Sequence, residues 1–457
     1  MLLAEPAPAI HRASGRRPLR WATLFAIAAA LAIILGAVRD RWFRAEPMLD
    51  PAALVAGYGP ADASLAGTRA DAAVAGARQH LALGPGQWLR EEGLARALIA
   101  RHRLTGDYAD LGEADRLLAA GLDRTPDPAG PVLTRASLSL LLHRLPEAQA
   151  ALARAARWGV PTTDEQADAL ALAGDIAQQR GDPKAAMRDY ARAAVLAESN
   201  GIELRRSMLL ARTGERDLAK AQLEALLARP RQSPRGLAEL SLQRAQLAYA
   251  EGDWEGAARW VAAAERLFPG YWLADAYVAQ TLALAGRRGE AINRYTEVAT
   301  SADSPEAMDA LALLLRLDGR RDESLAWWRR ADALWRDRLA RFPEAAALHA
   351  AEHALIGGRP DEALRLASAD AVRRPYGASL AVLARVLILA GRPYDALAAL
   401  DRAEAQGWVS AGLLMLRAEA TAALGDENAS AAAQARAEAI NPRAADPGTR
   451  LIWFGHD

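Results

Sequence analysis

Apolar residues recur at helical spacing along most of this chain, from about residue 90 to residue 442. Examples are SLAVLARVLILA at residues 379–390 and GAARWVAAAERL at residues 256–267. Apolar positions three and four residues apart fall on one face of an α-helix, so each segment predicts an amphipathic helix of about twelve to fourteen residues. No stretch alternates Val, Ile, Thr and aromatic residues with polar ones, as a half-buried strand would. We therefore predict an all-α fold.

A six-residue motif separates these helices and repeats along the chain. Residues 358–363 read GRPDEA, and residues 391–396 read GRPYDA, 33 residues later. Related motifs begin at Gly106, His143 (in the place of glycine), Gly181, Gly214, Gly252, Gly286, Gly319 and Gly425. A spacing of 33 to 39 residues, kept over more than 300 residues, is typical of a solenoid built from repeated units.

Each residue of the motif has a role in ending one helix or starting the next. Glycine adopts the left-handed conformation that ends a helix at little cost. A proline two residues later fits the first turn of a helix, where its missing N–H had no partner. The acidic residues that follow lie near the positive end of the second helix dipole. The motif therefore predicts a unit of helix, tight turn, helix and break, and it explains the acidic residues without catalysis.

This unit resembles the tetratricopeptide repeat family. Seven residues before the turn glycine, where the family has a small residue, stand Gly174, Ala245, Ala279, Ala312, Ala351, Ala384 and Ala418. Twelve residues after that glycine, where the family has alanine, stand Ala193, Ala264, Ala403 and Ala437. The resemblance implies a right-handed superhelical solenoid of about ten helix–turn–helix repeats over residues 60–442. It also implies a concave groove lined by the first helix of each repeat.

The resemblance further implies where a partner would bind. In that family ligands lie in the concave groove. The polar residues at groove-facing positions of this chain are Gln246, Tyr249, Gln280, Asp309, Arg316, Glu352, Arg385 and Glu419. We predict these eight residues as the partner-binding site. A second interpretation is that they form the solvated face of each helix.

An apolar segment near the start of the chain predicts a membrane anchor. Residues 21–38, WATLFAIAAALAIILGAV, carry no charge and would span about 27 Å as a helix, close to the thickness of a bilayer's hydrocarbon core. Four arginines precede the segment and three follow it, which favours a cytoplasmic N-terminus. We predict a tail at 1–20, one transmembrane helix at 21–38, a linker at 39–59, a periplasmic solenoid and a tail at 443–457. A cleaved signal peptide and a cytoplasmic solenoid are the alternatives.

Charge and composition exclude several classes of function. Lys+Arg and Asp+Glu number 56 each, and the two signs are interspersed, which disfavours a nucleic-acid partner. The chain has no cysteine, so it has no disulfide, thiolate metal site or cysteine nucleophile. It also has no GxxxxGK[ST] phosphate loop and no GxSxG elbow. We expect no cofactor.

One motif suggests catalysis, namely HAAEH at residues 349–353. It matches H-x-x-E-H, in which two histidines four residues apart bind zinc and the glutamate acts as the base. The motif falls inside the predicted first helix of the GRPDEA unit, and no third zinc ligand is evident. We therefore predict that His349 and His353 are ordinary residues of the solenoid, with no metal, and that the protein is not an enzyme. A zinc-dependent peptidase is the rival hypothesis.

These observations predict a scaffold that holds other proteins. The resemblance implies an inner-membrane protein that binds proteins or peptides of a membrane complex during assembly of the bacterial envelope. Polysaccharide synthesis or export is favoured over c-type cytochrome maturation and over outer-membrane protein handling. The apolar end TRLIWFGHD leaves two interpretations open: it folds back onto the last helix pair, or it serves as a docking peptide.

Overall fold

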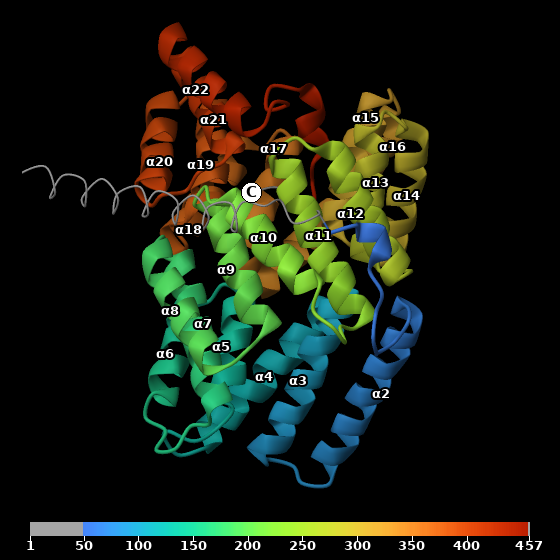
Figure 1. Ribbon diagram of the computed structural model, residues 1–457, viewed down its shortest axis with the longest axis vertical. Coiled ribbons are helices and arrows are strands. Elements are labelled where there is room, and N and C mark those ends of the chain that lie inside the picture. The colour runs from blue at the N-terminus through green and yellow to red at the C-terminus, as the bar shows by residue number, and fades with distance from the viewer. Residues whose placement is uncertain (1–48, 456–457) are drawn as a thin grey trace, which may run out of the picture. The chain divides into compact units, whose positions relative to one another are not determined.

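A computed structural model describes residues 49–455 of the chain (Figure 1). Every regular element in these residues is a helix, and the helices belong to one compact unit that begins at Pro51. The predicted transmembrane segment 21–38 lies outside the described residues, so the anchor stays a prediction. Among the helices of residues 49–455, none is long and apolar enough to cross a membrane.

Within the described residues, helices α3 to α22 form ten consecutive helix–turn–helix pairs. The pairs are α3 (Trp88–Thr105) with α4 (Tyr108–Arg124), α5 (Val132–Leu141) with α6 (Leu145–Ala155), α7 (Thr163–Gln179) with α8 (Pro183–Leu196), α9 (Asn200–Arg212) with α10 (Arg216–Leu227), α11 (Pro234–Ala250) with α12 (Trp254–Leu267), α13 (Trp272–Leu284) with α14 (Arg288–Ser301), α15 (Pro305–Leu317) with α16 (Arg321–Arg341), α17 (Pro343–Ile356) with α18 (Pro360–Arg373), α19 (Gly377–Leu389) with α20 (Pro393–Ala405), and α21 (Ala411–Ala423) with α22 (Glu427–Ile440). The 3-10 helix η1 (Pro51–Ala53) and helix α2 (Ala63–Ala82) precede these pairs, and η2 (Pro447–Leu451) follows them. Each helix packs mainly on its partner and on the next pair, so the predicted all-α solenoid is confirmed.

The repeated motif forms the turn within each pair. At GRPDEA, Gly358 has a φ of 68°, in the left-handed region that glycine adopts cheaply. Pro360 is the first residue of α18, and Asp361 and Glu362 lie in its first turn. Between α5 and α6, His143 takes the place of the glycine with a φ of 58°. A residue with a side chain pays roughly 1–2 kcal/mol for that conformation.

Small residues let the two helices of a pair approach closely. A Cβ atom at Gly174 on α7 would lie 2.6 Å from the Cδ1 atom of Tyr190 on α8. Tyr190 is fully buried, and its hydroxyl donates a hydrogen bond to Asp175 at 2.8 Å. In another pair the same position is Ala384, which is also fully buried. The small side chains at this position therefore set how closely the paired helices pack.

The solenoid turns far enough for its later repeats to pack against its earlier ones. Phe342, just before α17, packs on Tyr108 at the start of α4, with ring centroids 5.6 Å apart. The guanidinium of Arg338 lies 4.4 Å from the centroid of the same tyrosine ring. The Val409 N–H donates to the carbonyl oxygen of Arg212 at 2.9 Å. These partners are 197 to 234 residues apart in the sequence, so they join successive superhelical turns.

This packing covers turns of the earlier pairs. A Cβ atom at Gly181 would lie 2.8 Å from the carbonyl oxygen of Pro375, and one at Gly214 would lie 3.7 Å from the Cβ of Val409. A Cβ atom at Gly391, in a later pair, would meet no described atom within 4 Å. The same turn motif therefore lies inside the stack in early repeats and at its edge in late ones.

Candidate functional site

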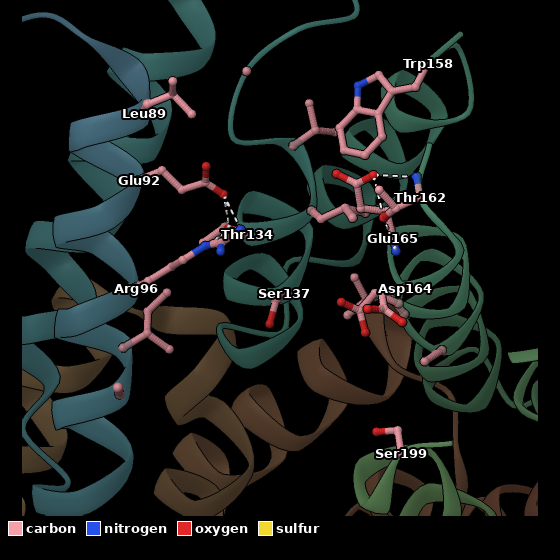
Figure 2. A pocket seen from close by; sticks show the side chains of 18 of the residues that line it. Leu89, Glu92, Arg96, Thr134, Ser137, Trp158, Thr162, Asp164, Glu165 and Ser199 are labelled. Atoms are coloured by element: carbon pink, nitrogen blue, oxygen red, sulfur yellow. Dashed lines mark hydrogen bonds and ion pairs between the residues drawn. The ribbon is translucent and has the colours of Figure 1, made fainter. Parts of the chain in front are cut away.

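The concave side of the first pairs encloses an opening of about 940 Å³ among α3, α5, α7 and α9. Figure 2 shows Leu89 and Arg96 of α3 on one side, Asp164 and Glu165 of α7 on the other, and Ser137 of α5 between them. We call this opening the open groove. Because first helices of consecutive repeats build it, a segment of polypeptide could follow it from one repeat to the next.

Large apolar side chains in the open groove face solvent. Leu89 on α3 is 65% exposed, and Val160, in the loop before α7, is 95% exposed. The indoles of Trp88 and Trp158 also line the groove. The Trp158 Nε1–H donates to the carbonyl oxygen of Pro128 at 2.9 Å, which fixes the orientation of that ring. Exposed apolar side chains that line one opening are typical of a protein-binding surface.

Charged side chains of both signs lie among these apolar groups. Desolvation lowers the pKa of the Arg103 guanidinium, and the positive charges of Arg235 and Arg205 lower it further. Desolvation also raises the pKa of the Asp168 carboxyl, although Arg205 partly offsets this effect. Both side chains are exposed, so each charge is open to a ligand that carries the opposite charge. A ligand that supplied opposite charges would therefore be favoured at both positions.

Other polar side chains of the open groove are already paired with one another (Figure 2). The Glu92 carboxylate accepts from the Thr134 hydroxyl at 2.5 Å and from the Arg96 guanidinium at 2.8 Å, which ties α3 to α5. At the start of α7, the Glu165 carboxylate accepts from the Thr162 N–H at 2.8 Å, and this bond lowers the pKa of Glu165. These contacts position the walls of the groove, which leaves the exposed apolar groups, Arg103 and Asp168 to contact a ligand.

A second section of the concave surface is filled by the end of the described chain. The side-chain oxygen of Gln280, on α13, accepts from the Trp453 N–H at 2.7 Å and from the Phe454 N–H at 2.8 Å. The side-chain nitrogen of Gln280 donates to the Phe454 carbonyl oxygen at 3.1 Å. Gln280 is fully buried. One buried amide thus forms hydrogen bonds with three main-chain groups of Trp453 and Phe454. We call residues 453–455 the 453–455 segment.

Tyrosine rings surround the side chain of Phe454. The centroid of its ring lies 5.9 Å from that of Tyr277 and 6.3 Å from that of Tyr295, and Tyr249 stacks on Tyr277 at 6.4 Å. Phe454 is buried, and burial raises the pKa values of the Tyr277 and Tyr295 hydroxyls, so both stay neutral. We call Gln280 and these three tyrosines the aromatic pocket. Of the two interpretations of the chain's end, folding back is observed, but onto α13 rather than onto the last helix pair.

The eight residues predicted to bind a partner fall into three groups by their surroundings. Those at or beside the aromatic pocket are Gln246, Tyr249 and Gln280. Those exposed on α15, α19 and α21 are Arg316, Arg385 and Glu419. The remaining two, Asp309 and Glu352, are buried.

These two buried residues contact the histidines of the HAAEH motif. His353 is 1% exposed, with Nδ1 lying 2.7 Å from Asp309 Oδ1 and Nε2 lying 3.3 Å from Asp332 Oδ1. Nδ1 of His349 lies 3.1 Å from the Glu352 carboxylate. The structure therefore places Asp309 inside the repeat stack rather than on the groove. The described residues contain no group of three or more His, Asp or Glu side chains arranged to hold a metal ion.

The open groove was missed by the sequence prediction, which named no residue before Gln246. Gln246 and Gln280 stand six residues before their turn glycines, and the residues at the same position in α3 and α5 are Ala100 and Ser137. Both line the open groove. Ala100 is apolar, so a search for polar residues at that position passes over α3. Position within the repeat, rather than polarity, was the usable signal.

Comparisons with known proteins bear on the fold alone. The sequence matches no family model and no curated protein. The structure is similar to a tetratricopeptide repeat protein from Parabacteroides merdae (TM-score 0.34, 16% identity, 60% of this chain and 98% of that chain), to the APC/C hetero-tetramer Cut9–Hcn1 (0.36, 13%, 85% and 94%) and to a monomeric mutant of IFIT1 with Gppp-AAAA (0.41, 12%, 77% and 90%). Likenesses this distant carry no argument about function. The helix pairs themselves show that the described chain is an all-α solenoid that resembles tetratricopeptide repeat folds.

Proposed function

We propose that this protein is a scaffold that binds a segment of a partner protein in the open groove. The observation that carries the proposal is the exposure of Leu89 and Val160 beside charged side chains of both signs, in a groove built by four first helices. Such a groove presents an extended surface along which a polypeptide can lie. Binding of this kind needs no reactive group and no cofactor.

The side chains of the open groove favour a partner segment of mixed character. Leu89 and Val160 would contact apolar side chains of the partner, Arg103 would take an acidic group, and Asp168 would take a basic one. Exposed ion pairs contribute only about 0–1 kcal/mol each, so the apolar contacts would supply most of the affinity. The charges would chiefly set the direction in which the segment lies.

We also propose that residues 21–38 hold the scaffold at the inner membrane, with the solenoid on the periplasmic side. This part of the proposal rests on the apolar character of the segment and on the arginines around it. Confinement at the membrane would raise the effective concentration of a partner in the same membrane. The partner we favour is a protein of an envelope complex, with polysaccharide synthesis or export as the leading pathway.

Copurification from native membranes tests the binding surface. The wild-type protein should recover a partner that the Leu89→Asp, Val160→Asp double variant does not recover. A matched control is Val372→Asp, because Val372 on α18 is similarly exposed but does not line the groove. Equal recovery by all three proteins would refute the proposal.

A reporter fused after Asp457 tests the topology. A reporter that is active only when exported should be active in the fusion. Activity of a reporter that works only in the cytoplasm would defeat the periplasmic assignment and leave the groove proposal intact.

A further inference from the structure

The aromatic pocket holds its own chain through contacts that a different peptide could also make. The Gln280 amide accepts from the N–H groups of Trp453 and Phe454 and donates to the Phe454 carbonyl oxygen, so it bonds the main chain of the segment rather than its side chains. Gln280 is fully buried, so removing the segment would leave both ends of its amide without these partners. A buried amide that loses its hydrogen bonds is costly, so an empty pocket would favour any segment that restored them.

Two features give the pocket a definite preference. The cage of tyrosines accepts a flat ring, here that of Phe454. The next residue, Gly455, has a φ of 75°, and a Cβ atom there would lie 2.6 Å from the Tyr277 hydroxyl oxygen. Because both the backbone and the available space favour glycine, the pocket selects an aromatic residue followed by glycine.

Contacts outside the aromatic pocket hold the residues that precede the 453–455 segment. Leu451 and Ile452 are only half-buried, so Phe454 supplies the buried contact of this stretch. Upstream, the Arg443 guanidinium lies 4.4 Å from the Trp254 ring centroid and donates to Glu255 at 3.0 Å. These contacts lie on α12 and do not involve the aromatic pocket. The residues before position 453 would therefore stay attached while the 453–455 segment leaves the pocket.

We propose that the aromatic pocket is a second peptide-binding site, which the 453–455 segment occupies in cis until a partner displaces it with a segment carrying an aromatic residue followed by glycine. This inference rests on the proposed role of the concave surface in binding proteins. Because the 453–455 segment is covalently joined to the solenoid, its effective concentration at the pocket is on the order of millimolar. A partner must compete with it, so the site responds only to an abundant or multivalent partner.

Peptide binding to the full-length protein tests the inference. The probe is a fluorescent peptide with the sequence of residues 449–455, TRLIWFG, followed by fluorescence anisotropy. Two variants release the segment without altering the pocket: Phe454→Ala removes the ring, and Gly455→Ala places a methyl group against Tyr277. We expect each variant to bind the probe at least tenfold more tightly than the wild type does. Adding Gln280→Ala to Phe454→Ala, or replacing the phenylalanine of the probe with alanine, should remove that gain.

Two results would overturn the inference. One is equal binding of the probe by the wild type and both variants, because the cis segment would then not be a competitor. The other is no binding by variants whose circular dichroism matches that of the wild type, because the segment would then be only a structural cap. Recovery of a partner through Leu89 and Val160 is measured separately. Failure of the peptide assay would therefore leave the open groove standing, and the reverse also holds.

Discussion

Replacing His353 with alanine should destabilise the solenoid far more than replacing His349 does. His353 lies between two carboxylates, those of Asp309 and Asp332, which come from different helices. Asp309 is 2% exposed; burial raises its pKa, and the contact with His353 offsets part of that rise. The His353 ring also stacks on Trp328, with centroids 5.0 Å apart. The substitution therefore removes a buried partner of two acids together with a packed ring.

The magnitude follows from burial. Leaving a buried carboxylate without its partner costs about 3–5 kcal/mol. Asp332 keeps Arg336 and Arg359 as partners, so we expect the lower end of that range, about 3 kcal/mol, for His353→Ala. The His349 side chain is 45% exposed, so the loss of its contact with Glu352 should cost only about 1 kcal/mol.

Urea unfolding of the purified protein, with and without EDTA, measures both effects. The structural account predicts a much lower midpoint for His353→Ala than for His349→Ala, and no effect of EDTA on the wild type. A zinc site predicts a different pattern. Both histidines would be ligands, so the two substitutions would cost similar amounts, and EDTA would destabilise the wild type because the metal would stabilise the fold. Equal losses from the two substitutions, together with a midpoint lowered by EDTA, would refute the reasoning and revive the peptidase hypothesis.

Three further predictions use the same unfolding assay. Gly174→Ala should destabilise the protein by about 1 kcal/mol, because overpacking against Tyr190 outweighs the roughly 1 kcal/mol that alanine gains in a helix. In a Tyr190→Leu background the same substitution should carry no penalty. Gly181→Ala should cost about 1–3 kcal/mol more than Gly391→Ala, since the first alone meets the next superhelical turn; equal costs would contradict that contact. Burial, with nearby positive charges, holds the pKa of His143 well below 6.5. The contribution of neutral His143 to the free energy of unfolding should therefore be fully present above pH 6.5. It should be lost as the pH falls below 6.5, because only the unfolded chain then gains the proton, and His143→Gly should abolish this dependence.

Local features of the fold were predictable because local chemistry determines them. Gly358 ends a helix and Pro360 begins one whatever the rest of the chain does. A period of about 34 residues likewise implies a stack of helix pairs. The turn glycines Gly319 and Gly358 are 39 residues apart, which exceeds the period of about 34 residues by more than one helical turn. In the structure the additional residues extend α16 to 21 residues rather than forming a loop.

Contacts between distant repeats were not predictable, because they depend on the summed rotation of many units. Phe342 meets Tyr108 only after the solenoid has turned back on itself, and nothing in either residue's neighbourhood indicates the other. The same holds for Gln280 and Phe454, which are 174 residues apart. The resemblance to tetratricopeptide repeats predicted Gln280 at a groove-facing position. It had no means of showing that the chain's own end already fills that place.

Site-specific photo-crosslinking tests the central claim, that the open groove binds a protein partner. A photoreactive residue would replace Ser137, between the walls of the open groove, and in a second protein it would replace Val195, which is highly exposed on α8 but does not line the groove. After irradiation in native membranes, the account predicts that the probe at position 137 captures the partner found by copurification. It also predicts that the probe at position 195 does not, and that Leu89→Asp with Val160→Asp removes the crosslink. Capture at position 195 with none at position 137 would contradict the account.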